Sequence, residues 1–129
     1  MKNLITKNLL FGAAFGFIGV ALGAFGAHGL KNIVSPDLLV IFETGARYQM
    51  YHAFALLFTG LLQFHIQSKH LSMAGNFFIA GIFLFSGSLY AMTFTGIRTF
   101  GAITPFGGVS FLVGWFLLVL AVVKNKKDA

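Results

Sequence analysis

The sequence has no cysteine among its 129 residues. Disulfide bridges, thiolate metal sites and cysteine nucleophiles are therefore excluded, although this absence does not fix the cellular compartment. Charge is also scarce, because Asp, Glu, Lys and Arg together make up 9% of the chain while hydrophobic residues make up 57%. Soluble domains usually hold about 25% charged residues, and their surface helices need a polar face. A water-soluble globular fold is not expected.

Four long apolar stretches separate the charged parts of the chain. They lie at about residues 9–30, 46–64, 73–93 and 105–123. Each is close to the roughly 20 helical residues that cross a hydrocarbon core of about 30 Å. The sequence therefore predicts an all-α fold, with residues 1–129 forming a single transmembrane domain built as an integral membrane four-helix bundle.

A short interfacial helix is predicted just before the second span. Ser35, Pro36 and Asp37 supply a capping residue, a first-turn proline and an acidic residue at the helix start. Glu43 and Arg47 follow at a spacing of four residues, at which opposite charges can pair on a helix. They are predicted to form an interfacial ion pair at the outer end of the second span.

The basic residues decide the predicted orientation in the membrane. One side of the four spans carries Lys2, Lys7, Lys69, Lys124, Lys126 and Lys127, and the other side carries Lys31, Arg47 and Arg98. Because the more basic side usually stays inside, both termini are predicted to lie in the cytoplasm. The net charge of +6 does not predict a nucleic-acid partner, since the basic residues form neither one face nor one tract.

Glycines follow one stripe of the first span. Gly12, Gly16, Gly19, Gly23 and Gly26 are separated by steps of four, three, four and three residues. This spacing places them on one helix face. In a bilayer such a face lets another helix come close, so helix packing is the preferred interpretation, and a smooth wall along a permeation path is the alternative.

The second span has a polar and an apolar face. The interior face is predicted to hold Tyr48, His52, Ala55, Thr59 and Gln63, and the lipid face Met50, Phe54, Leu57, Phe58 and Leu61. Gln63 and Asn76 fall near the cytoplasmic ends of adjacent spans, which predicts a hydrogen bond between their side chains. Trp115 lies near the middle of the fourth span, where its indole N–H needs an acceptor, so it is expected to point into the bundle.

Several short strings occur together and in order along the chain. They are the segments 23–30, 48–52, 85–90 and 101–105 and the pair Gly114-Trp115. With these strings the chain resembles the YwdK/YgdD-like family of uncharacterised small multi-pass bacterial membrane proteins, a domain of unknown function. The resemblance covers about residues 10–120. It implies a multi-pass protein of the bacterial cytoplasmic (inner) membrane and supplies no activity.

The distinctive polar residues are predicted to gather near the outer leaflet. They are His28, Tyr48, Tyr51, His52 and Tyr90. In the preferred interpretation, Tyr48, His52 and Tyr90 hydrogen-bond one another and fix the register of the helices. In the sharper one, His52 and His28 bind a small molecule or an ion, because histidine titrates near neutrality. A metal site is disfavoured, because no histidine or carboxylate spacing suits one helix face, and no cofactor is expected.

No set of nucleophile, base and orienting residue is evident, so the chain is predicted not to be an enzyme. The preferred function is a structural or accessory role in the lipid bilayer, with a homo-oligomer or another membrane protein as partner. The alternative is a small oligomeric transporter or channel with a polar site near the outer leaflet. Against it, Asp37 and Glu43 are expected at the interface and no acidic residue is buried inside a span, whereas coupled carriers usually need one.

Overall fold

The computed structural model describes residues 2–128, with the backbone alone for residues 6 and 126–128. This part of the chain contains helices and turns and no strand, so the predicted all-α class is confirmed. The elements are α1 (Lys2–His28), the 3₁₀ turn η1 (Leu30–Asn32), α2 (Pro36–Leu62), α3 (Lys69–Gly81), the π-helical turn η2 (Ile82–Ser86), α4 (Gly87–Thr95), the 3₁₀ turn η3 (Arg98–Ala102) and α5 (Thr104–Asp128).

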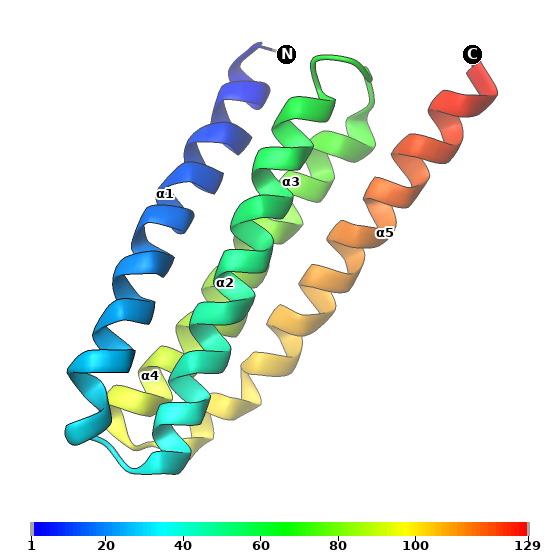
Figure 1. Cartoon of the computed structure of the whole chain (residues 1–129). Helices are drawn as coiled ribbons and strands as arrows, with labels where there is room; N and C mark the ends of the chain where they lie inside the picture. The colour runs from blue at the N-terminus through cyan, green and yellow to red at the C-terminus, as the bar shows by residue number, and fades with distance from the viewer. Residues whose placement is uncertain (1, 129) are drawn as a thin grey trace.

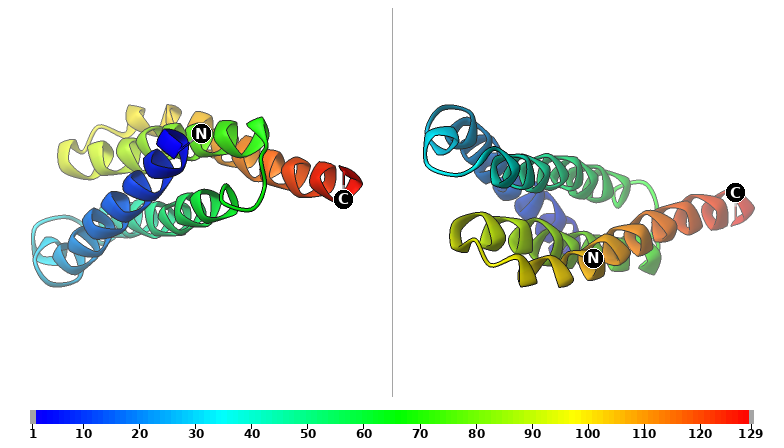
Figure 2. Two further views of the ribbon diagram at one scale, coloured as in Figure 1. Left: turned by 90° about the horizontal axis from the view of Figure 1, so that it is seen from above. Right: turned by 90° about the horizontal axis from the view of Figure 1, so that it is seen from below.

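Long helical segments lie side by side and run in alternating directions (Figure 1). α3, η2 and α4 follow one another without a break and act as one segment. The N- and C-terminal ends of the chain therefore lie at the same end of the molecule (Figure 1). In the views from above and below, the C-terminal part of α5 extends away from α1 (Figure 2).

α2 is the central helix of the molecule. It packs against α1 and also against α3, η2 and α4, while α5 packs chiefly on α3. Among the described residues, three segments are long and apolar enough to cross a membrane, at residues 2–32, 69–95 and 98–125. α2 is not among them, because its charged and polar residues, such as Arg47, Gln49 and His52, lower its hydropathy. Gln49 and His52 lie on the buried face of α2, where they meet protein and not lipid.

The two predicted faces of α2 agree with the burial of its side chains. His52, Ala55, Thr59 and Gln63 are buried, whereas Phe54, Phe58 and Leu61 are exposed. Tyr48, which was assigned to the interior face, is partly exposed. Leu57 and Met50, which were assigned to lipid, are half-buried against Gly12 and Gly19 of α1.

The predicted interfacial helix is not a separate element, because α2 runs without interruption from Pro36 to Leu62. Ser35 has the extended backbone of a capping residue, but its hydroxyl donates to Asp37 Oδ1 at 2.5 Å and does not accept a backbone N–H. Gly45 stays helical, with the ring of Tyr90 against it. The absence of a side chain at Gly45 thus lets α2 and α4 come close together and does not bend α2.

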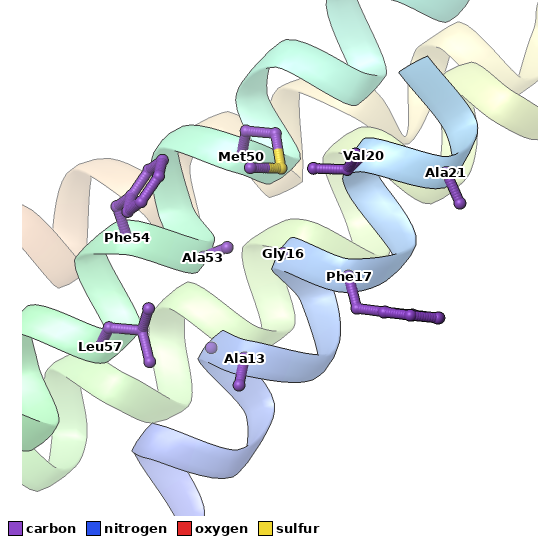
Figure 3. A pocket seen from close by; sticks show the side chains of 10 residues that line it. Ala13, Gly16, Phe17, Val20, Ala21, Met50, Ala53, Phe54 and Leu57 are labelled. Atoms are coloured by element: carbon purple, nitrogen blue, oxygen red, sulfur yellow. The ribbon is translucent and has the colours of Figure 1, made fainter. Parts of the chain in front are cut away.

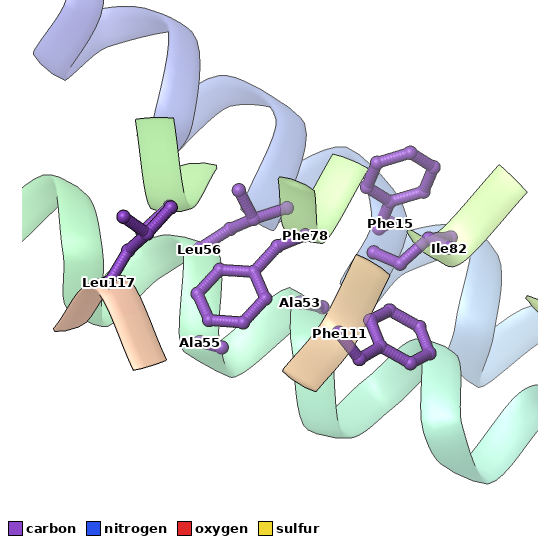
Figure 4. Close-up of a cluster of buried hydrophobic side chains, with 9 residues drawn as sticks. Phe15, Ala53, Ala55, Leu56, Phe78, Ile82, Phe111 and Leu117 are labelled. Atoms are coloured by element: carbon purple, nitrogen blue, oxygen red, sulfur yellow. The ribbon is translucent and has the colours of Figure 1, made fainter. Parts of the chain in front are cut away.

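Aromatic rings on α3 and on α5 pack against glycines of the other helix and hold the two helices together. A Cβ atom at Gly114 would lie 2.6 Å from the ring of Phe78, and one at Gly81 would lie 2.4 Å from the ring of Phe111. Phe78 and Phe111 belong to the main cluster of buried hydrophobic residues (Figure 4). Because each ring fills the space left by a glycine of the other helix, this contact fixes the register of α5 on α3.

Candidate functional site

His52 has both ring nitrogens engaged inside the protein. Its Nδ1 lies 2.7 Å from the backbone oxygen of Tyr48, one turn earlier on α2. A carbonyl oxygen can only accept, so Nδ1 carries the proton and donates it. The free lone pair is then on Nε2, which accepts the indole N–H of Trp115 from α5 at 3.1 Å. The structure thus selects the neutral Nδ1–H tautomer.

Aromatic rings enclose the imidazole of His52, which is only 4% exposed. It stacks on Phe111 with the ring centroids 3.5 Å apart and the planes 5° apart. Phe78 and Trp115 contact it at centroid distances of 5.6 and 5.9 Å. A proton added to Nε2 would point at the Trp115 N–H, so this arrangement favours a neutral imidazole with no lone pair left for a ligand.

A groove opens beside His52 on the surface between α2 and α5. Its volume is about 570 Å³. The lining residues are Tyr48, Tyr51, His52, Phe54, Phe85, Gly108, Phe111, Leu112 and Trp115. The wall is mostly aromatic, and among the described residues the hydroxyls of Tyr48 and Tyr51 have no hydrogen-bond partner. This groove suits an apolar occupant with little polar character.

The remaining residues of the predicted polar site lie elsewhere. Tyr90 of α4 donates its hydroxyl to Gln49 Oε1 at 2.7 Å, and Gln49 Nε2 donates to the backbone oxygen of Phe15 at 2.9 Å. His28 is exposed at the end of α1 and makes no hydrogen bond or ring contact with another described residue. The structure therefore brings together Tyr48, Tyr51 and His52 but separates them from Tyr90 and His28.

The sequence-based reasoning missed Gln49, which connects α1, α2 and α4 through its amide. The sequence does contain a signal for Gln49, because an uncharged polar residue in a membrane span is costly unless it finds hydrogen-bond partners. Trp115 was expected to find an acceptor inside the protein, and His52 provides it. Even so, the Trp115 side chain remains partly exposed along the groove.

A second set of polar contacts lies at the end of the molecule that holds both chain termini, where α1 and α3 begin and α2 ends. Asn8 Nδ2 donates to Gln63 Oε1 at 2.8 Å, and Lys7 Nζ donates to Asn76 Oδ1. The predicted bond between Gln63 and Asn76 is therefore wrong. Asn8 takes the place beside Gln63 because Gly75 leaves room for it, since a Cβ there would lie 2.2 Å from Asn8 Oδ1.

The glycine stripe of α1 divides into two sets. Gly12, Gly19 and Gly26 face large side chains of α2, with a Cβ position 2.6–2.9 Å from Leu57, Met50 and Phe42 respectively. Gly16 and Gly23 have nothing within 4 Å of a Cβ position. Gly16 lies in a groove of about 490 Å³ between α1 and α2 (Figure 3). The stripe thus serves packing in part and leaves an open surface beside it.

The ion pair of the described residues joins Asp37 to Arg98, at the end of the molecule opposite the termini. Glu43 and Arg47, predicted to pair, are both exposed and form no ion pair or hydrogen bond with any described residue. Asp37 is the better partner for a cation because η3 brings Arg98 next to the start of α2. No cluster of three or more metal-binding side chains occurs among the described residues.

Acidification should weaken the contact between α2 and η3. The hydrogen bonds from Ser35 and Arg98, together with the charge of Arg98, lower the pKa of Asp37 to about 2 from 3.8. A carboxyl whose pKa is lowered by folding stabilises the folded state above its unfolded pKa, and this contribution is lost as the pH falls through its folded pKa. In thermal unfolding scans, the wild type should lose more stability between about pH 4 and about pH 2 than Asp37→Asn. Parallel pH profiles of the two proteins would contradict this.

Relatives of this chain are membrane proteins. The family model described as "Protein of unknown function (DUF423)" matches residues 22–108. The UPF0382 membrane protein SAB0533 of Staphylococcus aureus is 43% identical over 116 residues, which cover 90% of this chain and 94% of the relative. YwdK of Bacillus subtilis is 43% identical over 117 residues, covering 90% and 95%. The chain belongs to this family.

The family extends across distant bacteria. The UPF0382 membrane protein of Haemophilus influenzae is 42% identical over 126 residues, which cover 98% of each chain. The resemblance drawn from the short strings is therefore confirmed, and the chain is a membrane protein. No solved structure matches it.

Proposed function

We propose that this chain is a structural or accessory protein of the bacterial cytoplasmic membrane and not an enzyme. In this proposal its long helical segments form a four-helix bundle that crosses the bilayer four times, with both termini in the cytoplasm. The basic residues Lys2, Lys7 and Lys124 lie at the end that holds both termini, which suits the cytoplasmic side. In this proposal the protein is embedded in the lipid bilayer.

One observation carries the structural role. The buried polar side chains His52 and Gln49 of α2 bond to the protein itself: His52 uses both nitrogens, and Gln49 uses both ends of its amide. A proton carrier or an ion site needs polar groups with free valences that face a cavity or a path. Here the same groups join neighbouring helices, as expected for residues that fix helix register.

The bond between His52 and Trp115 provides the test. We expect His52→Phe and Trp115→Phe each to destabilise the protein, and a double-mutant cycle to give a coupling of about 0.6–1.7 kcal/mol, from the average to the maximum found for such bonds in a membrane protein. Stability is measured by titration with a denaturing detergent in mixed micelles. His70→Phe, at the exposed bond between His70 and Lys124, is the control and should change stability little.

The same proteins decide between a structural role and transport. Proteoliposomes holding the wild type should pass protons and monovalent cations no faster than empty vesicles. A flux that the wild type supports and His52→Phe abolishes would overturn the structural role in favour of the small oligomeric transporter or channel. A coupling energy near zero would show that the His52–Trp115 bond does not hold the helices together.

A further inference from the structure

One face of α2 is exposed along its whole length. The stripe, called here the outer face of α2, consists of Val40, Glu43, Arg47, Tyr51, Phe54, Phe58 and Leu61, all exposed. Phe54 lines both the α1–α2 groove and the α2–α5 groove, and it is seen at the edge of the first of these in Figure 3. The outer face of α2 is thus a ridge with an apolar groove on each side.

Two opposite charges stand on this ridge without a partner. Glu43 and Arg47 lie one helical turn apart, and within the described part of the chain neither forms an ion pair or a hydrogen bond. In contrast, the exposed charges at the helix end, Asp37 and Arg98, do pair with each other. The described residues therefore leave both charges on the ridge open to a partner from outside the chain.

These charges lie below the membrane surface if α2 crosses the bilayer. Its 27 residues extend for about 40 Å, roughly 10 Å more than the hydrocarbon core. With this excess shared between the ends, about 5 Å of helix protrudes on each side. Glu43 lies about 10 Å and Arg47 about 16 Å from Pro36 along the helix, so both Cα atoms are inside the core.

The opposite signs of Glu43 and Arg47 indicate which kind of molecule binds to this ridge. A phosphate of an anionic lipid would suit Arg47, but Glu43 one turn closer to the surface would repel it. A surface that presents one acidic and one basic residue is complementary to a copy of itself under a two-fold axis, because every contact of such an interface occurs twice. Two copies inserted in the same direction place Glu43 of each near the level of Arg47 of the other.

We propose that the outer face of α2 binds a second copy of the same chain, with Glu43 of each copy paired to Arg47 of the other. The long side chain of Arg47 reaches toward the membrane surface, as basic side chains do in bilayers, and there it meets the partner's Glu43. The ridge residues Phe54 and Phe58 lie deeper on the same contact. The open groove beside Gly16, where no other helix comes within 4 Å of a Cβ position, gives large side chains of the second copy a place to pack.

Charge reversal tests the proposal with the full chain. Glu43→Arg places two cations on the ridge, and Arg47→Glu places two anions there. Each variant alone should dissociate at a concentration at least about tenfold higher than the wild type, since close like charges replace both pairs. When the two variants are mixed with different mass tags, they should form a heterodimer, because both crossed pairs are then attractive.

The measurement is native mass spectrometry in a mild detergent over a range of protein-to-detergent ratios, with thermal unfolding to check that each variant is folded. Glu43→Gln and Arg47→Gln, which add no repulsion, should weaken the dimer less than the reversals. Asp37→Arg is the matched control at the exposed end of α2 and should leave the dimer unchanged. Heterodimers from the mixture support the proposal whatever the stability of the separate variants.

Three results would overturn the proposal. The wild type is monomeric at every ratio, the single reversals dimerise as well as the wild type, or the mixed reversals fail to form heterodimers while remaining folded. A monomeric wild type that carries an anionic lipid, which Arg47→Glu then loses, would reassign Arg47 to a lipid headgroup.

Discussion

Replacing Gly107 by alanine is expected to destabilise the protein by about 2–3 kcal/mol, the upper part of the range for overpacked contacts. A Cβ at this position would lie 2.3 Å from the backbone nitrogen of Phe85 and 2.7 Å from its Cα. Backbone atoms cannot rotate away as a side chain can. Since Phe85 belongs to the π-helical turn η2, either the turn must refold or α5 must move away from η2.

The neighbouring glycine supplies a matched control. A Cβ at Gly108 would meet only the ring of Phe85, at 4.0 Å, which is an ordinary contact. Gly108→Ala should therefore leave stability within about 0.5 kcal/mol of the wild type, as surface substitutions do. Titration with a denaturing detergent gives both values under the same conditions. Equal losses for the two alanines would contradict the close approach of α5 to η2.

The π-helical turn shows where sequence-based prediction ends. A π turn gives a helix one extra residue in its ladder and often marks a functional site. Nothing in the segment 82–86 predicts a π turn in place of an ordinary apolar helix. In the structure, Ser86 of this turn donates to the Gly45 oxygen, and Gly107 lies against Phe85. Both contacts come from helices far away in the sequence.

The all-α class and the buried side of α2 could be predicted from the sequence for a simple physical reason. A helix in a bilayer satisfies its own backbone, so each apolar stretch reports its own structure, and the spacing of polar residues reports the buried face. His52 and Thr59 are buried and Phe54 and Phe58 are exposed, as the periodicity of α2 indicates. These properties depend on one segment at a time.

The hydrogen-bond partners that join side chains of different helices could not be predicted in the same way. The sequence placed Gln63 near Asn76, but the structure pairs it with Asn8. It grouped Tyr90 with His52, although Gln49 takes the Tyr90 hydroxyl on another side of α2. Such pairs depend on the rotation of each helix about its axis and on which helices are neighbours, and periodicity within one segment gives neither.

Gln49 is expected to contribute more to stability than any other single polar residue of α2, because its amide joins two further helices. Gln49→Leu keeps the volume but removes both bonds and leaves the part-buried Tyr90 hydroxyl without its acceptor. We expect a loss of about 1–3 kcal/mol, the usual cost of an orphaned buried group. Tyr90→Phe, which leaves only the Gln49 oxygen unpaired, should cost less.

The double variant separates an orphaned group from a simple loss of packing. In Gln49→Leu with Tyr90→Phe, neither partner is left polar, so the penalty for an unpaired hydroxyl disappears. Its loss of stability should be smaller than the sum of the two single losses by about 0.6–1.7 kcal/mol. Strictly additive losses, measured by the same detergent titration, would mean that the amide acts only by filling space. Thr95→Ala, at an exposed hydroxyl that donates to Ala91 and accepts from the Ile97 N–H, should show no coupling to Gln49→Leu and serves as the reference for independent sites.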